Sequence, residues 1–153
     1  MDVNEKAPAF TLPNENGEPV ALSSFKGKPV VLFFYPRANT PGCTVEACNF
    51  RDSYGQLTAA GLTVLGISPD VPRAQKKFQE KYDLPYTLLA DADKAVAQLF
   101  GVLKEKNMYG KKVMGIERTT FLISPDGTIR HVWRKVKPEG HAGEVLNYYL
   151  GNH

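Results

Sequence analysis

The chain has 153 residues, of which 42% are hydrophobic and 23% charged, and its formal net charge is +3. This balance is typical of one folded domain with a real apolar core, so we expect a single domain over residues 1–153. The small charge excess favours neither nucleic-acid nor membrane binding, and no apolar run reaches the roughly 20 residues of a transmembrane helix. The start, Met1 to Lys6, lacks the pattern of a secretory signal, so we expect a cytoplasmic protein.

The first part of the chain alternates extended segments with turns. Residues Ala7 to Pro13 and Val20 to Leu22 flank the turn Asn14 to Gly17, so we expect them to pair as a hairpin. A single helical turn then ends at Gly27. The run from Pro29 to Tyr35 is nearly all apolar and branched or aromatic, which predicts a strand buried on both faces.

The middle of the chain alternates helical and extended patterns. We expect helices at Pro41 to Ala60, Val71 to Tyr82 and Asp93 to Phe100, and strands at Leu62 to Ser68 and Tyr86 to Leu89. Apolar side chains at helical spacings predict a core-facing stripe on the first of these helices, formed by Val45, Phe50, Tyr54 and Leu57.

The last part of the chain predicts a hairpin and a closing helix. Lys104 to Gly115 is polar and contains glycine, which indicates a solvated loop or a weak strand. Strands at Arg118 to Ser124 and Thr128 to Lys135 are joined by a turn, and Pro138 to Leu150 is a helix. The whole order predicts an α/β fold with a mixed central sheet flanked by helices, parallel in its first central pair and antiparallel in the late hairpin.

Both cysteines lie in the stretch that follows the apolar strand. Thr40 suits the N-cap of the next helix and Pro41 suits its first position, which places Cys43 in the first turn. Unpaired backbone N–H groups and the positive end of the helix dipole favour a thiolate there, and the thiolate is the nucleophilic form of cysteine. Cys43 is therefore the candidate nucleophile.

The second cysteine, Cys48, cannot reach Cys43 while the helix is intact. Five residues along a helix separate two Cα atoms by roughly 8.7 Å, which exceeds the ~7 Å limit for a disulfide. A Cys43–Cys48 disulfide therefore requires the first turns to unwind, which predicts a switch between a helical reduced form and a locally unfolded oxidised form. Inert core cysteines and a metal site are the alternatives; two thiols without a nearby histidine supply too few ligands for zinc, so we expect no metal.

Several runs of residues resemble one family. Pro36-x-x-x-Thr40-x-x-Cys43 resembles the active-site motif of the peroxiredoxins. The run from Pro41 to Asp52 resembles the branch of that family named bacterioferritin comigratory protein or peroxiredoxin Q. Glu117 to Ile123 resembles the strand that carries the family's arginine. The resemblance extends over nearly the whole chain and implies a thioredoxin-like fold.

The resemblance also implies an activity and a set of partners. A peroxiredoxin is a thiol-dependent peroxidase, and the positions match with Cys43 as the peroxidatic and Cys48 as the resolving cysteine. Cys43 would be oxidised by hydrogen peroxide or an organic hydroperoxide to a sulfenic acid, and Cys48 would then form the disulfide. Thioredoxin or a glutaredoxin-like protein would reduce that disulfide, and no haem, flavin or metal is required. A monomer is expected, because no long C-terminal arm follows the last helix.

Four further residues have expected roles at the site. Arg118 matches the family's arginine and would bring a permanent charge and a fork of donors, although an exposed ion pair is its simpler explanation. Thr40 could donate its hydroxyl to the thiolate or the peroxide, and Pro36 could shield the thiolate from water. Glu46 shares the helical face of Cys43 and could orient Arg118, while a solvated acid at a helix start explains it equally well.

Two other functions remain open from the sequence. A thioredoxin-like disulfide reductase would normally use C-x-x-C, and the C-x4-C spacing counts against it. A redox-sensing or holdase-like binding module could use the same switch without catalysis. The three histidines, His131, His141 and His153, show no spacing that suggests a Cys–His pair and are interpreted as ordinary surface or partly buried residues.

Overall fold

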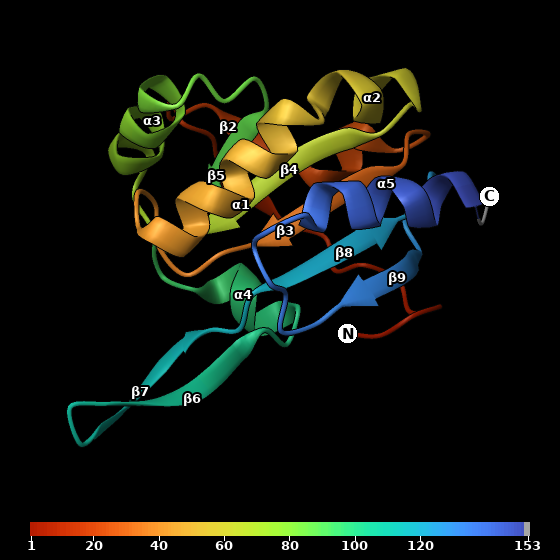
Figure 1. Ribbon diagram of the computed structural model, residues 1–153. Helices are drawn as coiled ribbons and strands as arrows, with labels where there is room; N and C mark the ends of the chain where they lie inside the picture. Colours follow the sequence, from red (N-terminus) through yellow and green to blue (C-terminus); the bar gives the residue numbers. More distant parts are fainter. Residues whose placement is uncertain (152–153) are drawn as a thin grey trace.

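A computed structural model of the chain describes residues 1–151 and has a five-stranded sheet at its centre, in the order β5-β4-β3-β8-β9 (Figure 1). The parallel strands are β3 (Val30–Phe34), β4 (Thr63–Ser68) and β5 (Thr87–Ala90). The strands β8 (Thr119–Ile123) and β9 (Ile129–Trp133) add to the other edge of β3 in antiparallel pairings. The expected mixed sheet is confirmed, with parallel pairs where helices connect the strands and an antiparallel pair at the hairpin.

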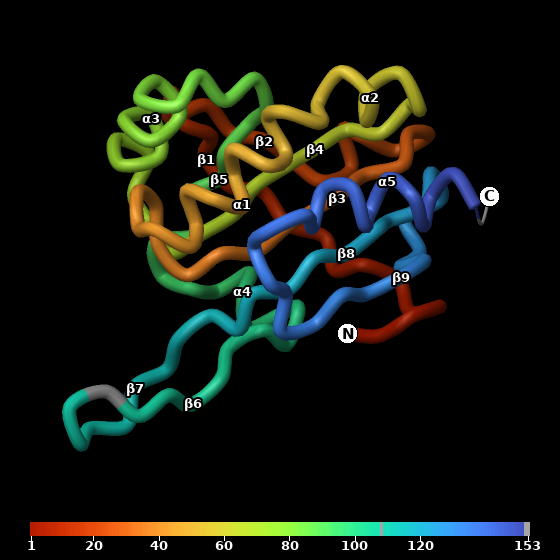
Figure 2. The backbone as a smooth tube through the Cα atoms, in the orientation of Figure 1, coloured from red at the N-terminus to blue at the C-terminus, as the bar shows by residue number. Residues whose placement is uncertain are grey.

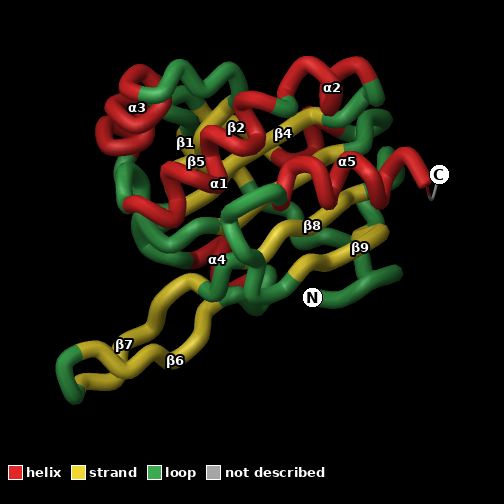
Figure 3. Tube along the Cα trace, viewed as in Figure 1, coloured by secondary structure: helices red, strands yellow, loops and turns green. Residues whose placement is uncertain are grey.

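Helices cover both faces of this sheet. They are α1 (Pro41–Asp52), α2 (Tyr54–Ala59), α3 (Pro72–Lys81), α4 (Ala95–Leu99) and α5 (His141–Gly151). Figure 3 shows α1, α2 and α5 lying across one face of the sheet. Within residues 1–151, no helix has the length and apolar character that crossing a membrane would demand.

Strand β3 builds two apolar cores, because successive side chains of a strand point to opposite faces. Val31 and Phe33 belong to the core beneath α1, α2, α3 and α5, whereas Leu32 and Phe34 belong to the core that includes α4. All five residues of β3 are buried, as expected for a strand covered on both sides. Tyr35 continues the first core directly beyond the strand.

The helix expected from Pro41 to Ala60 is interrupted at Ser53, which is a correction to the sequence analysis. Ser53 has φ −97° and ψ 3°, outside the helical region, and both Ser53 and Gly55 are weak helix formers, so little resists a break there. Phe50 and Leu57 are nevertheless both fully buried on either side of it. Val45, expected in the core stripe, is 42% exposed, and Tyr54 is only partly buried.

Two hairpins lie outside the central sheet. The expected first one pairs β1 (Thr11–Pro13) with β2 (Pro19–Ala21), and a 3-10 turn, η1 (Leu22–Phe25), follows it. The stretch expected as a loop or weak strand is an antiparallel ribbon of β6 (Leu103–Met108) and β7 (Lys111–Ile116), which projects from the body (Figure 2). Its base is fixed in the core by the buried Ile116.

The close packing of β4 against its two neighbouring strands predicts that adding one methyl group at Gly66 lowers stability. A Cβ atom at Gly66 would lie 2.9 Å from both Leu88 Cδ2 and Phe33 Cζ, in the centre of the buried sheet. We expect Gly66→Ala to lower the free energy of unfolding by about 1–3 kcal/mol, because overpacking forces the neighbours to shift. Urea denaturation measures the change.

Gly55→Ala is the matched control, because a Cβ atom at Gly55 in α2 has nothing within 4 Å. It should leave stability unchanged or raise it by up to ~1 kcal/mol. Equal effects of the two substitutions would contradict the packing argument.

Candidate active site

The loop between β3 and α1 presents Cys43 at the carboxyl end of β3. Thr40 has the extended backbone of an N-cap residue, and Pro41 is the first helical residue, as expected. The Thr40 hydroxyl, however, makes no capping hydrogen bond and donates instead to the carbonyl of Arg37 at 2.8 Å. The placement of Thr40 at the N-cap and of Cys43 in the first turn is therefore confirmed, although the Thr40 side chain does not cap the helix.

Arg118 contacts both Cys43 and Glu46. Its Nη2 lies 3.5 Å from Cys43 Sγ, and its Nη1 donates to Glu46 Oε1 at 2.7 Å. Cys43 is only 2% exposed, so the contact is largely shielded from water. Burial lowers the pKa of Arg118, but the Glu46 carboxylate and the Cys43 thiolate outweigh that effect and raise it overall. The guanidinium is therefore charged at every relevant pH.

Glu46 is a buried acid and not a solvated one. Its side chain is fully buried, and within residues 1–151 its Oε2 atom has no hydrogen-bond partner. Burial raises the pKa of Glu46 to about 7, although the attraction of Arg118 opposes that shift. The sequence analysis left a solvated acid and a partner of Arg118 equally open, and the geometry favours the partner.

A hydrogen-bond chain that the sequence analysis missed fixes the loop before α1. Tyr35 donates to Gln75 Oε1 at 2.5 Å, and the Gln75 amide donates to Ser68 Oγ at 2.8 Å. Ser68 donates to Asp70 Oδ2 at 2.7 Å, and that oxygen also accepts the backbone N–H of Ala38 at 2.8 Å. Burial raises the pKa of Tyr35 well above its usual value, so the phenol stays a neutral donor.

The other two site residues expected from the sequence, Cys48 and Pro36, lie near the same loop and helix. Cys48 is partly exposed in α1, and both cysteines are free thiols in an intact helix, which matches the reduced form expected from the sequence. Pro36 is partly buried directly after Tyr35. Its shielding of the thiolate stays a prediction.

Neither of the two histidines within residues 1–151 has a cysteine as its hydrogen-bond partner. His141, expected at or near the surface, is only 2% exposed, so that expectation is wrong. Its ring nitrogens lie 2.8 Å from Thr120 Oγ1 and from Glu144 Oε1, and burial lowers its pKa. His131 is partly buried and stacks on Tyr148 with ring centroids 4.1 Å apart. His153 lies outside the described residues.

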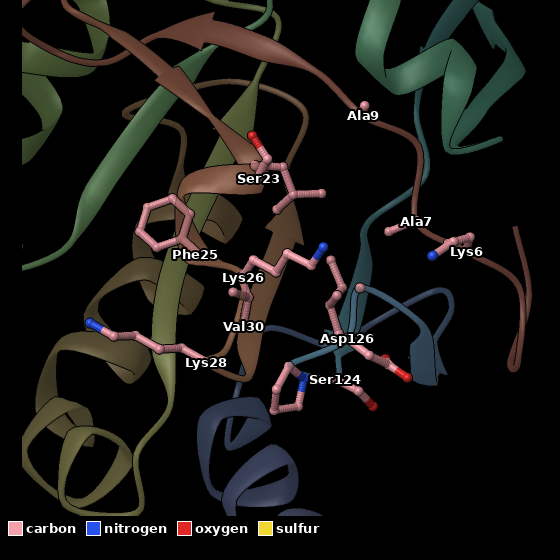
Figure 4. A pocket seen from close by; sticks show the side chains of 14 residues that line it. Lys6, Ala7, Ala9, Ser23, Phe25, Lys26, Lys28, Val30, Ser124 and Asp126 are labelled. Atoms are coloured by element: carbon pink, nitrogen blue, oxygen red, sulfur yellow. The ribbon is translucent and has the colours of Figure 1, made fainter.

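An apolar cavity of about 270 Å³ lies at the amino end of β3, whereas Cys43 follows the carboxyl end of that strand. Figure 4 shows its walls, with residues 23–28 on one side and Ser124 to Asp126 on the other. The cavity contains neither cysteine and is not the reactive site. Among residues 1–151, no three His, Cys, Asp or Glu side chains are grouped as metal ligands.

A thioredoxin-like sheet that holds a thiol against a guanidinium at a helix start is the arrangement expected of a cysteine-dependent redox enzyme. Residues 3–132 match the AhpC/TSA family. A bcp protein of Coxiella burnetii is 54% identical over 146 residues, which cover 95% of this chain and 97% of that protein. Peroxiredoxin Bcp of Bacillus subtilis is 46% identical over 146 residues, which cover 95% and 93% of the two chains.

Solved structures that resemble this chain belong to the same group of proteins. A mutant of Xanthomonas campestris peroxiredoxin Q has a TM-score of 0.93 at 39% identity, with both chains covered completely. The bacterioferritin comigratory protein of the same organism, described for its alkyl peroxide reduction activity, has a TM-score of 0.88 at 40% identity, covering 93% of this chain and 90% of that one. The chain belongs to the AhpC/TSA family, in the Bcp and peroxiredoxin Q group, and is a thiol-dependent peroxidase.

The raised pKa of Glu46 predicts a pH-dependent stability. Between the ordinary value of 4.5 and about 7, the folded protein binds this proton more tightly than the unfolded chain does. The contribution of Glu46 to the free energy of unfolding is therefore fully present below pH 4.5 and is lost as pH rises through 7. Urea denaturation across this range should show the fall.

Glu46→Gln is the comparison, because the amide can still accept from Arg118 but does not titrate. Its free energy of unfolding should fall less steeply than that of the wild type across the same pH range. Parallel curves for the two proteins would show that Glu46 does not titrate there.

Proposed function

We propose that Cys43 is the peroxidatic cysteine for hydrogen peroxide and organic hydroperoxides. Its thiolate attacks one peroxide oxygen, so an S–O bond forms, the O–O bond breaks, and the second oxygen leaves as hydroxide or alkoxide that takes up a proton. The sulfur is oxidised to a sulfenic acid and the peroxide is reduced to water or an alcohol. The observation that carries this proposal is the 3.5 Å contact between Cys43 Sγ and Arg118 Nη2 in a shielded site.

Arg118 and Glu46 act together in this step. A fixed, permanently charged guanidinium stabilises the thiolate and the negative charge that builds on the leaving oxygen, and its effect is larger where water is excluded. Glu46 positions the guanidinium through the 2.7 Å hydrogen bond to Nη1, which leaves Nη2 directed at the sulfur. Glu46 is thus a positioning residue, and Arg118 is catalytic.

Thr40 and Pro36 complete the proposed site. Because the Thr40 hydroxyl proton is engaged by the Arg37 carbonyl, its lone pairs are the groups offered to an incoming peroxide O–H. Donation from Thr40 to the thiolate, as the sequence analysis expected, would require that hydroxyl to rotate. Pro36 covers the thiolate and limits the approach of water.

The sulfenic acid is resolved inside the chain. The Cys48 thiolate attacks the Cys43 sulfur, an S–S bond forms, and the oxygen leaves as water. Since an intact helix keeps the two Cα atoms roughly 8.7 Å apart, α1 must open for this step. A dithiol protein, thioredoxin or a glutaredoxin-like donor, then reduces the disulfide through a mixed disulfide.

The remaining features of the proposal concern the whole chain. Residues 1–153 act as one domain, as a monomer in the cytoplasm, and the cycle uses no metal or organic cofactor. The alkyl peroxide reduction named for the Xanthomonas campestris relative supports organic hydroperoxides as substrates. The intact helix through both cysteines counts against a disulfide reductase, which needs thiols that bridge without unwinding.

Substituting the cysteines separates the two chemical steps. Cys43→Ser should abolish peroxide consumption, whereas Cys48→Ser should still consume one equivalent and accumulate the sulfenic acid. Peroxide loss and intact mass after a stoichiometric addition measure both outcomes. Insulin reduction without peroxide turnover by the wild type would instead support the reductase.

Removing the guanidinium should slow the first step. We expect Arg118→Ala to lower the second-order rate constant for peroxide by about a hundredfold, as typical for a lost charge-stabilising donor. Stopped-flow measurement of peroxide loss gives this constant. Arg134→Ala is the matched control, because Arg134 contacts the carbonyl of Met1, and it should react at the wild-type rate.

A further inference from the structure

The carboxyl half of α1 is attached to the rest of the molecule by hydrogen bonds on both sides of Cys48. Before it, the buried Tyr86 hydroxyl donates to the Ala47 carbonyl at 2.6 Å. After it, Asn49 Oδ1 accepts the backbone N–H of Ala142 at 2.7 Å, near the start of α5. Figure 1 shows α1 and α5 lying side by side on this face of the sheet.

Two further contacts hold this half of the helix. Arg51 Nη1 donates to the carbonyl of Tyr82 at 2.8 Å. Phe50 is fully buried and stacks on Phe33 with ring centroids 4.6 Å apart. The carboxyl half of α1 is thus fixed to the sheet, to α5 and to the segment after α3.

The amino half of α1 is held differently. Within the described part of the chain, the tertiary hydrogen bonds of residues 41–46 are those of Arg118 to Cys43 and Glu46, and oxidation of the sulfur alters the first of them. Val45 faces water. The preceding loop is fixed at Ala38 by Asp70, and among residues 1–151 the next residue, Asn39, is held only by an exposed contact of its Oδ1 with Lys81 Nζ at 3.4 Å. Residues 39–46 therefore lie between two fixed points.

We infer that Tyr86 and Asn49 confine the unwinding of α1 to residues 39–46, so that Cys43 moves to a Cys48 that stays in place. This inference rests on the proposed function and makes Tyr86 and Asn49 positioning residues for disulfide formation. A Cys48 thiol held on a fixed backbone loses less conformational freedom when the bond forms than one on a second unfolded segment.

The fixed position of Cys48 also affects a competing reaction of the Cys43 sulfenic acid. Cys43 either condenses with Cys48, releasing water, or attacks a second peroxide. In the second case the sulfur gains another oxygen to become a sulfinic acid, and the peroxide leaves as water or an alcohol. Releasing Cys48 from its fixed position should favour the second reaction.

Amide exchange of the wild-type disulfide form, followed residue by residue by NMR, directly tests the boundary between the unwound and the intact part of α1. The N–H of Thr44, bonded to Thr40 in the reduced protein, should exchange freely. The N–H groups of residues 51–53, which include the bond from Ser53 to the Asn49 carbonyl, should stay protected. Equal exchange in the two regions would overturn the inference.

The double variant Tyr86→Phe with Asn49→Ala removes both hydrogen bonds. It should raise the amide exchange rates of residues 51–53 in the oxidised form roughly tenfold. At a fixed peroxide excess it should also raise the sulfinic acid fraction severalfold, measured by intact mass. A boundary and a sulfinic fraction that both match the wild type would overturn the inference.

Asn49→Asp is the matched control, because a carboxylate at this position still accepts from the Ala142 N–H. Its negative charge also suits the amino end of α5, where Ala142 lies. It should keep the wild-type boundary and the wild-type sulfinic fraction. The rate of the first peroxide reaction should be the same in all these proteins, since none of the changes touches Cys43 or Arg118. Failure of the wild type to consume peroxide would instead defeat the proposed function.

Discussion

The interaction on which the site depends is the bridge that Arg118 makes between the Cys43 sulfur and the Glu46 carboxylate. Even a partly buried guanidinium is costly unless its charge is matched, and Glu46 supplies the matching acceptor. The same hydrogen bond fixes the direction of the fork, which leaves a donor for the sulfur. The sheet makes this possible, because the register of β3 and β8 pairs Phe34 with Thr119 and so brings Arg118 beside the end of β3.

The rigidity of the frame and the lability of the reactive helix have separate physical origins. The frame is fixed by β3, whose alternate side chains fill two cores, and by the buried hydrogen-bond chain from Tyr35 to Ala38. The reactive turn buries little besides Cys43 and Glu46, because Val45 is exposed. Segments with few buried apolar contacts open at low cost, which is what disulfide formation over a C-x4-C spacing demands.

The uneven attachment of α1 connects this lability to the chemistry. Hydrogen bonds to Ala47 and from Ala142 fix the helix around Cys48. The turn around Cys43, in contrast, is held by the contact between Arg118 and the sulfur that reacts. The break at Ser53 further separates α1 from α2, so opening of the first turns need not disturb the buried Leu57. A helix with one fixed and one releasable half suits a reaction in which one thiol travels to the other.

The sequence by itself determined the features that short-range signals control. An apolar run predicts β3, Pro41 marks the helix start, and the spacing of Cys43 and Cys48 requires unwinding, because each depends on residues a few positions apart. The resemblance to the peroxiredoxins added the peroxidase chemistry, and the resemblance of residues 117–123 added Arg118. The projecting ribbon of β6 and β7 was left undecided between a loop and a weak strand.

Only the tertiary structure decided the contacts between distant residues. Arg118 and Glu46 are 72 positions apart, and their pairing follows from sheet register, which local propensity does not encode. The tertiary structure also decides which side chains are buried: His141 lies inside and Val45 is exposed. Burial in turn raises the pKa of Glu46. The hydrogen bonds from Tyr86 to the Ala47 carbonyl and from the Ala142 N–H to Asn49 likewise depend on where distant backbone lies, because a hydrogen bond forms only with an acceptor or donor that the fold brings within reach.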